Sequence, residues 1–245
     1  MAETSRRPSF RLLAAVMAAL VAFAILISLG NWQVRRLHWK EALLSDIETR
    51  RTAAVALPLE DIRRMVADGQ DVDYRRATAS GHFLNDKERH FLSTYQGEAG
   101  FNVYTPLALD DGRYLFVNRG FVPYDLKAPD KRAAGLPADA VTVTGLARGR
   151  LAAKPSSLVP DNDAAKNIFY WKDLDGMAAS VGLPSDKVLP FFIDADDTPV
   201  PGGWPKGGVT LIDLPNSHLE YAITWYGLAL ALAGVCGYAL LRRRR

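Results

Sequence analysis

The chain carries a long apolar run at each end and, between them, short stretches in which apolar and polar residues alternate. Residues 12–29 form an uncharged run of 18 residues, and residues 221–241 form one of 21. A helix needs about 20 such residues to cross the roughly 30 Å of hydrocarbon in a bilayer. Both runs are therefore predicted to be transmembrane helices.

The part between the runs changes period. Residues 31–51 keep a helical pattern, with Trp32 and Trp39 on one face, and are expected to continue the first helix. From residue 75 onward the pattern is that of short strands separated by turn residues. The predicted strands are residues 75–83, 90–95, 101–109, 114–122, 141–148, 168–171 and 189–194. Six or seven short strands predict a sandwich or a barrel.

Turns and one short helix complete the prediction. Asp110-Asp111-Gly112 joins two alternating runs and predicts a hairpin. Residues 173–181 are expected to form a helix that Asp173 caps, with Gly182 past its end. Residues 127–138 and 152–166 are rich in Pro, Ala and Asp and are predicted to be exposed loops. The fold class is thus an α+β membrane protein in which two transmembrane helices flank a β-rich, barrel- or sandwich-like domain with one or two short helices.

The basic residues at the ends of the chain predict its orientation. Arg6, Arg7 and Arg11 precede the first run, and residues 242–245 are four arginines. Because positive flanks stay in the cytoplasm, the domain between the helices is expected outside it, in the periplasm of a bacterial inner membrane. The boundaries are a cytoplasmic N-terminus over 1–11, spans over 12–30 and 218–241, a periplasmic domain over 31–217 and a cytoplasmic C-terminus over 242–245. A cleaved signal peptide is the alternative for the first run, but its 18 residues exceed the roughly 7–15 of a typical signal core.

Charge and motifs exclude several function classes. The formal net charge is +3, but without the terminal arginines and Glu3 the chain has 23 basic and 26 acidic residues, so nucleic-acid binding is not expected. The single cysteine, Cys236, lies in the second apolar run and has no partner in the chain. The sequence lacks the zinc-protease, nucleophile-elbow, dinucleotide-binding and P-loop motifs. No enzymatic activity is predicted, and the lipid bilayer is an expected partner.

The second span begins with a candidate site. Ser217 and Glu220 have the spacing of a capping box, which places His218 in the first turn of the helix. His218, Tyr221 and Trp225 recur at helical spacing on one face. An imidazole above aromatic residues could be an axial ligand of a haem iron. The alternative is a capped helix with an aromatic belt at the membrane surface.

A haem site would need a second wall, and the first span offers one at matching depth. Trp32 could supply aromatic surface there, and Gln33, Arg35 and Arg36 could be partners for haem propionates. The alternative is again an aromatic belt, with arginines that extend to the interface.

Several motifs resemble those of the Surfeit locus protein one family, over nearly the whole chain. The sequence that opens the domain, Leu29-Gly30-Asn31-Trp32-Gln33, is similar to the family's first motif. Residues 117–123 resemble its Asn-Arg-Gly-Trp-Val-Pro signature, with Phe121 in place of the tryptophan. Residues 216–229 give the most specific match. Further similar segments are residues 81–83, 100–107 and 160–173.

The resemblance implies a β-rich domain outside the membrane and a role as an accessory protein in cytochrome c oxidase assembly. It implies help with the delivery or insertion of haem a into the catalytic subunit of a haem-copper oxidase, with His218 as the iron ligand. Trp32, Tyr221 and Trp225 would then be pocket walls, with Arg35 and Arg36 beside them. Haem A synthase is a second expected partner. The alternative is a scaffold for the oxidase subunit or the synthase that binds no haem itself.

Asn118 and Arg119 lie within one predicted strand. On an alternating strand one of the two must face inward, and a buried arginine needs a partner. We expect structural anchoring rather than partner docking for this pair.

Overall fold

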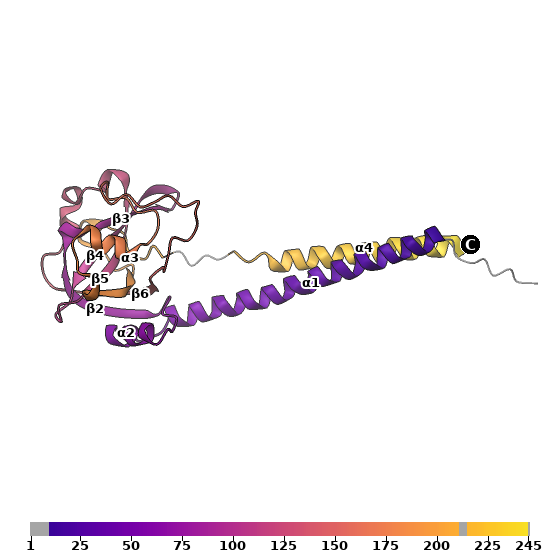
Figure 1. Cartoon of the computed structure of the whole chain (residues 1–245), viewed down its shortest axis with the longest axis horizontal. Helices are drawn as coiled ribbons and strands as arrows, with labels where there is room; N and C mark the ends of the chain where they lie inside the picture. Colours follow the sequence, from indigo (N-terminus) through magenta and orange to yellow (C-terminus); the bar gives the residue numbers. More distant parts are fainter. Residues whose placement is uncertain (1–9, 211–214, 245) are drawn as a thin grey trace, which may run out of the picture. The chain divides into compact units, whose positions relative to one another are not determined.

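The computed structural model describes residues 10–210 and 215–244, which divide into two compact units. The helical unit takes in helix α1 as far as Asp46 together with helix α4. The barrel unit lies within Ile47–Ile212 and contains all the strands. Figure 1 shows the strands gathered with the short helices α2 (Leu59–Ala67) and α3 (Leu174–Ser180).

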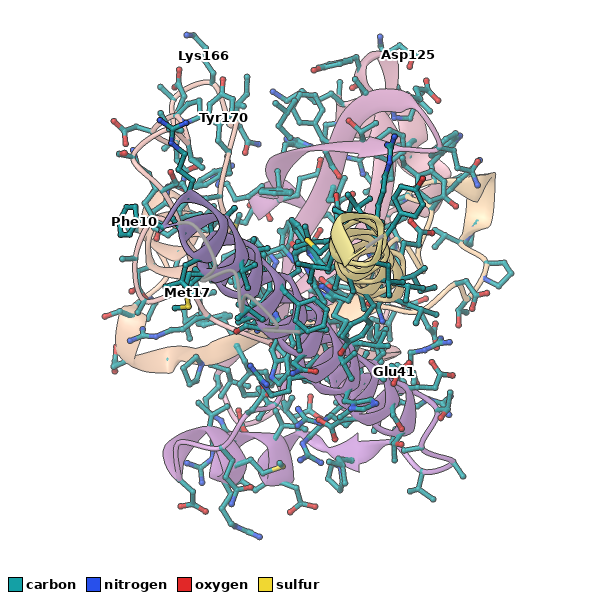
Figure 2. The ribbon with its side chains drawn as sticks, turned by 90° about the vertical axis from the view of Figure 1, so that its right-hand side faces the viewer. Phe10, Met17, Glu41, Asp125, Lys166 and Tyr170 are labelled. Atoms are coloured by element: carbon teal, nitrogen blue, oxygen red, sulfur yellow. The ribbon has the colours of Figure 1, made fainter. Side chains whose placement is uncertain are left out.

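The terminal helices confirm the two predicted apolar helices. Helix α1 runs over Phe10–Arg51 and α4 over His218–Arg244, and each is long and apolar enough to cross a membrane. Because α1 continues without interruption to Arg51, the predicted extension over residues 31–51 is also confirmed. Phe10 and Met17 lie on the side of α1 that faces away from α4 (Figure 2).

Six of the seven predicted strands are present, each within three residues of its expected bounds. Sequence reasoning missed a two-residue strand and the helix α2 (Leu59–Ala67) that follows it. The strands are β1 (Leu57–Pro58), β2 (Arg76–Phe83), β3 (Arg89–Tyr95), β4 (Glu98–Ala108), β5 (Tyr114–Pro123), β6 (Val141–Gly149) and β7 (Val188–Ala195).

The predicted strand over residues 168–171 is wrong. Only isolated bridges form there, from Phe169 to Phe91 and from Ile168 to Asp163. The reason is local, because the Asn162 side-chain oxygen accepts the backbone N–H groups of residues 170 and 171 at 2.7 and 3.2 Å. Those two donors are therefore not available to a neighbouring strand.

The sheet closes into a five-stranded barrel, which decides between the two predicted architectures. Strands pair in the order β2-β6-β7-β5-β4, and β4 returns to pair with β2. The β5–β7 pair is parallel and the others are antiparallel. Numbered along the chain, the barrel strands have the order 1-2-3-5-4-1, the connectivity of the OB-fold, a Greek-key barrel. Strands β1 and β3 extend the sheet beside β2 and β4.

Strand β5 is covered on both faces, which explains its almost continuous apolar sequence. Leu115 and Val117 pack in the core cluster that contains Ile62 of α2. Phe116 points to the opposite face, into the cluster that contains Met177 of α3 (Leu174–Ser180). The two short helices thus cover two separate cores.

The predicted turn and helix ends are confirmed, whereas one loop is not as expected. Gly112 has φ of +80° in the β4–β5 hairpin, and the Asp173 carboxylate accepts the Gly176 N–H at 2.9 Å as the cap of α3. Residues 127–138 are not an exposed loop throughout. They contain the 3₁₀ segment η3 (Pro129–Gly135), in which Arg132 is buried against a carboxylate.

Candidate functional site

The candidate site in the helical unit centres on a hydrogen bond between its two helices. His218 is the first residue of α4, and its Nδ1 lies 2.7 Å from Oε1 of Gln33 on α1. An amide oxygen only accepts hydrogen bonds, so Nδ1 is the donor in this bond, and in the neutral imidazole the free lone pair is then on Nε2. Metal-binding histidines commonly have this arrangement, in which one ring nitrogen is oriented by a carbonyl and the other faces the metal.

Close packing brings the two helices together beside this bond. A Cβ atom on Gly30 would lie 2.5 Å from the Tyr226 ring, so only glycine fits there without displacing that ring. The Tyr226 hydroxyl also donates a hydrogen bond to Asn31 Oδ1 at 2.7 Å. Gln33 lies one turn beyond Gly30 on the same face, which explains why its side chain is buried against α4.

The other predicted site residues on α4 differ in burial. Trp225 is half-buried, and its indole N–H is buried without an acceptor among the residues that the structure describes. Tyr221 is 53% exposed. An oxygen-bearing ligand on this face could accept from the Trp225 N–H, so the donor set is compatible with a haem group that carries oxygen substituents.

The predicted residues on α1 are exposed. Trp32 is 51% exposed, and Arg35 and Arg36 are exposed as well. The guanidinium of Arg36 lies 3.8 Å from the ring centroid of Trp39. The structure therefore brings Gln33, rather than the arginines, to His218, and the proposed propionate contacts stay a prediction.

Sequence reasoning placed Gln33 in the second wall, as a possible partner for haem propionates, but missed its pairing with His218. A signal for it does exist, because Gln33 follows Gly30 by three residues and therefore lies on the same face of the helix. Its partner, however, is 185 residues away in the sequence. Local periodicity cannot find a pair at that separation.

Polar residues are also buried in the barrel unit, among them both members of the Asn118–Arg119 pair. Asn118 Nδ2 donates to Asp194 Oδ1 at 2.9 Å, and Arg119 Nη1 donates to Asn85 Oδ1 at 3.3 Å. Both side chains are buried because both faces of β5 are covered. The inference that at least one of them faces inward is confirmed.

A second buried group joins Glu88, His90 and Arg132. The carboxylate of Glu88 accepts from Arg132 Nη2 and from His90 Nε2, the latter at 3.2 Å. Burial raises the pKa of Glu88, but the hydrogen bond from His90 and the Arg132 charge outweigh it, so the pKa lies below its usual value. Burial lowers the pKa of His90, against the opposing effect of Glu88. The imidazole is thus held neutral beside an ion pair.

Clusters of three or more His, Cys, Asp and Glu side chains that could hold a metal ion do not occur within the described ranges, 10–210 and 215–244. A haem iron would need only the open nitrogen of His218 from this chain, together with surrounding walls.

Taken together, the chain is a protein with two apolar terminal helices and a closed β-barrel unit, and with a histidine held by an amide between the helices. Residues 20–230 match the SURF1 family. The chain is 33% identical to Surfeit locus protein 1 of Rattus norvegicus, over 90% of this chain and 74% of the relative. It is 34% identical to that of Takifugu rubripes, over 85% and 89%, and 36% identical to a SURF1-like protein of Monosiga brevicollis, over 90% and 84%. The chain belongs to the SURF1 family.

Proposed function

We propose that the chain is an assembly factor for a haem-copper oxidase that receives haem a on His218 and passes it toward the catalytic subunit. The observation that supports this most directly is the 2.7 Å bond from His218 Nδ1 to Gln33. It fixes the imidazole and leaves Nε2 open, as a ligand to iron requires.

Several residues of the helical unit would hold haem a, each through a different contact. His218 would bind the iron, Gln33 would orient the imidazole, and Trp225 would offer its unpaired indole N–H. Tyr221 and Trp32 would cover the ring, and Arg35 and Arg36 would meet its propionates. Haem a, the iron-containing pigment, is cargo in this proposal. The chain would bind it and pass it on, and would itself catalyse no reaction.

The proposal includes the orientation in the membrane. With arginines beyond both apolar runs, the two termini lie in the cytoplasm and the barrel unit lies in the periplasm of a bacterial inner membrane. His218, at the start of α4, is then at the periplasmic surface, where haem can be exchanged with the oxidase subunit or accepted from haem A synthase.

The test is the visible spectrum of the full chain, purified from cells that make haem A. We expect a haem a band in the wild type that is lost in His218→Ala, because the ligand is removed. Gln33→Leu should shift or weaken the band, because the imidazole loses its orienting acceptor. His38→Ala is the matched control, since His38 is an exposed histidine on α1. A band that survives in His218→Ala would contradict the proposed ligand.

The second candidate function is a scaffold that holds an immature oxidase subunit or haem A synthase without binding haem. Exposed aromatic side chains on the helical unit favour it, because Trp32, Trp39 and Tyr221 are each about half exposed and could contact a partner helix. The same spectra separate the two candidates. Absence of a band in the wild type, together with intact oxidase assembly in His218→Ala cells, would support the scaffold.

A further inference from the structure

The barrel unit contains a cavity of about 380 Å³, which we name the Arg119 cavity. Its walls are mostly apolar and come from the end of β2, the first half of β6 and the segment after β7. They include Phe83, Val141, Val143, Ala195, Pro199 and Val200. The volume falls within the usual range for small-molecule sites, about 300–1,000 Å³.

Arg119 is the only cation among the residues that line this cavity. Its side chain is 5% exposed, and burial lowers its pKa to about 10, so it remains charged at neutral pH. Nη1 donates to Asn85 Oδ1, Nη2 donates to the Gly135 carbonyl, and the guanidinium lies 4.5 Å from the Phe83 ring centroid. These two bonds use two of the five N–H groups of the guanidinium.

No carboxylate lies within 4.0 Å of Arg119 in the part of the chain that the structure describes. Glu88 is near enough to raise the pKa of Arg119, but its carboxylate is already paired with Arg132. Asp196 also lines the cavity, but its carboxylate accepts the backbone N–H and the hydroxyl of Thr198, at 3.2 and 2.6 Å. A buried charge without a partner is costly, and an organic anion could provide the missing one.

Arg132 shows how the same unit treats a buried arginine that has a purely structural role. Its guanidinium is paired with the Glu88 carboxylate and also donates to the carbonyls of Leu126 and Lys127. Arg119 is equally buried, yet faces an apolar cavity in place of a carboxylate. Arg119 therefore keeps, besides its two structural hydrogen bonds, a charge without a direct ion pair at the wall of a cavity.

We propose that the Arg119 cavity binds a small organic carboxylate, with its carboxylate on Arg119 and its apolar body against β6 and residues 195–201. The chemistry fits because a guanidinium is the preferred partner of a carboxylate, while the apolar walls would gain nothing from an inorganic anion. This site lies in the barrel unit and does not depend on the proposed role of His218.

The experiment is isothermal titration of the full chain in lipid nanodiscs, with the signal of empty nanodiscs subtracted. The probes are cyclohexanecarboxylate, the neutral cyclohexanecarboxamide of the same shape, and inorganic phosphate. We expect the carboxylate to bind at least about tenfold more tightly than the amide or phosphate, which corresponds to about 1.4 kcal/mol. Equal binding of acid and amide, tighter binding of phosphate, or no binding of the acid up to about 10 mM would overturn the proposal.

Two variants on the 3₁₀ segment η3 locate the binding without altering Arg119. Ala134 lines the cavity and is exposed, whereas Ala133 is exposed on the same segment and does not line it. Ala134→Trp should weaken carboxylate binding at least about tenfold by filling the mouth, and Ala133→Trp should leave it unchanged. Equal effects of both variants would place the binding elsewhere.

Arg119→Met, checked for folding by circular dichroism, should abolish the preference for acid over amide.

Discussion

The barrel unit and the helical unit use their apolar residues in opposite ways. In the barrel unit, β5 is buried from Leu115 to Pro123, and its side chains have partners within the chain. In the helical unit, only 6% of the most apolar window of each terminal helix is buried. Exposed apolar surface of that extent is suited to lipid or to a partner helix. The first unit is therefore stabilised by its own core, and the second depends on its surroundings.

The two units also differ in what their polar contacts do. The helical unit has few contacts between α1 and α4, and polar ones such as His218–Gln33 and Tyr226–Asn31 fix how the helices meet. In the barrel unit, buried polar groups are additions to a core that is already dense. Changes to polar groups should thus alter stability in the barrel unit and geometry in the helical unit.

The largest expected effect is on the buried ion pair of the barrel unit. Arg132→Met leaves Glu88 buried without its cation and should lower the free energy of unfolding by about 3–5 kcal/mol. Urea unfolding of the full chain, followed by circular dichroism of the strands, measures it. Arg63→Met, which breaks an exposed pair with Glu60, is the control and should have no resolvable effect. Equal losses in both variants would show that burial of the pair is not what matters.

Replacement of Arg119 should have the next largest effect on the barrel unit. Arg119→Ala removes the donor to the buried Gly135 carbonyl and should lower the free energy of unfolding by about 1–3 kcal/mol. Loss of the costly unpaired charge offsets part of this, so the effect should be smaller than that of Arg132→Met. Unchanged stability together with lost oxidase assembly would instead indicate a docking role for Arg119.

The Asp173 cap should contribute less. Asp173→Ala removes the acceptor for the Gly176 N–H and should lower the free energy of unfolding by about 1 kcal/mol. Asp173→Asn retains a capping oxygen and should behave nearly as the wild type does. A loss of equal size in Asp173→Asn would mean that charge, rather than the cap, is responsible.

Protonation of His90 should make a modest contribution to the pH dependence of the free energy of unfolding. Because burial lowers the folded pKa of His90 below its usual 6.5, the unfolded chain binds more protons just below that pH. The stability of the barrel unit should therefore fall as pH drops below 6.5. His90→Gln should show a shallower slope in urea titrations between about pH 6.5 and 5. An unchanged slope would exclude His90 as the titrating group.

The smallest expected effect on the barrel unit comes from the helical unit. Gln33→Leu removes the acceptor for His218 within the helical unit, and the barrel unit has its own core, so the urea midpoint of the barrel unit should stay unchanged. The same variant should alter the haem a spectrum. A shifted midpoint would show that the two units are energetically coupled.

Patterns of short range were sufficient to predict most of the elements. The two apolar runs, the period-two strands and the Asp110-Asp111-Gly112 turn each depend on neighbouring residues, and all three are present. The closed barrel could not be derived in the same way, because β2 pairs with β6 and β5 with β7 across long stretches of sequence. Residues 168–171 were wrongly predicted as a strand because their apolar run has strand character, and the run itself does not show that a nearby side chain, Asn162, accepts two of its backbone N–H groups.

The candidate site was predicted in part for the same reason. His218 could be found because helix capping and face periodicity are local, and the family motif includes it. Its partnership with Gln33 depends on two helices that are far apart in the sequence. Arg35 and Arg36 share a depth with Trp32 but are exposed, which residue spacing alone could not show.

The parallel pairing of β5 with β7 has a consequence for synthesis of the chain. Strand β5 ends at Pro123, and its partner begins only at Val188. Until that later strand emerges from the ribosome, the barrel stays open. The backbone N–H and C=O groups of β5 and β6 that pair with β7 then have no partner strand. Closure is thus a late and long-range event of the kind that slows folding. It must wait for β7, the last strand in the chain order, which precedes α4 in the sequence.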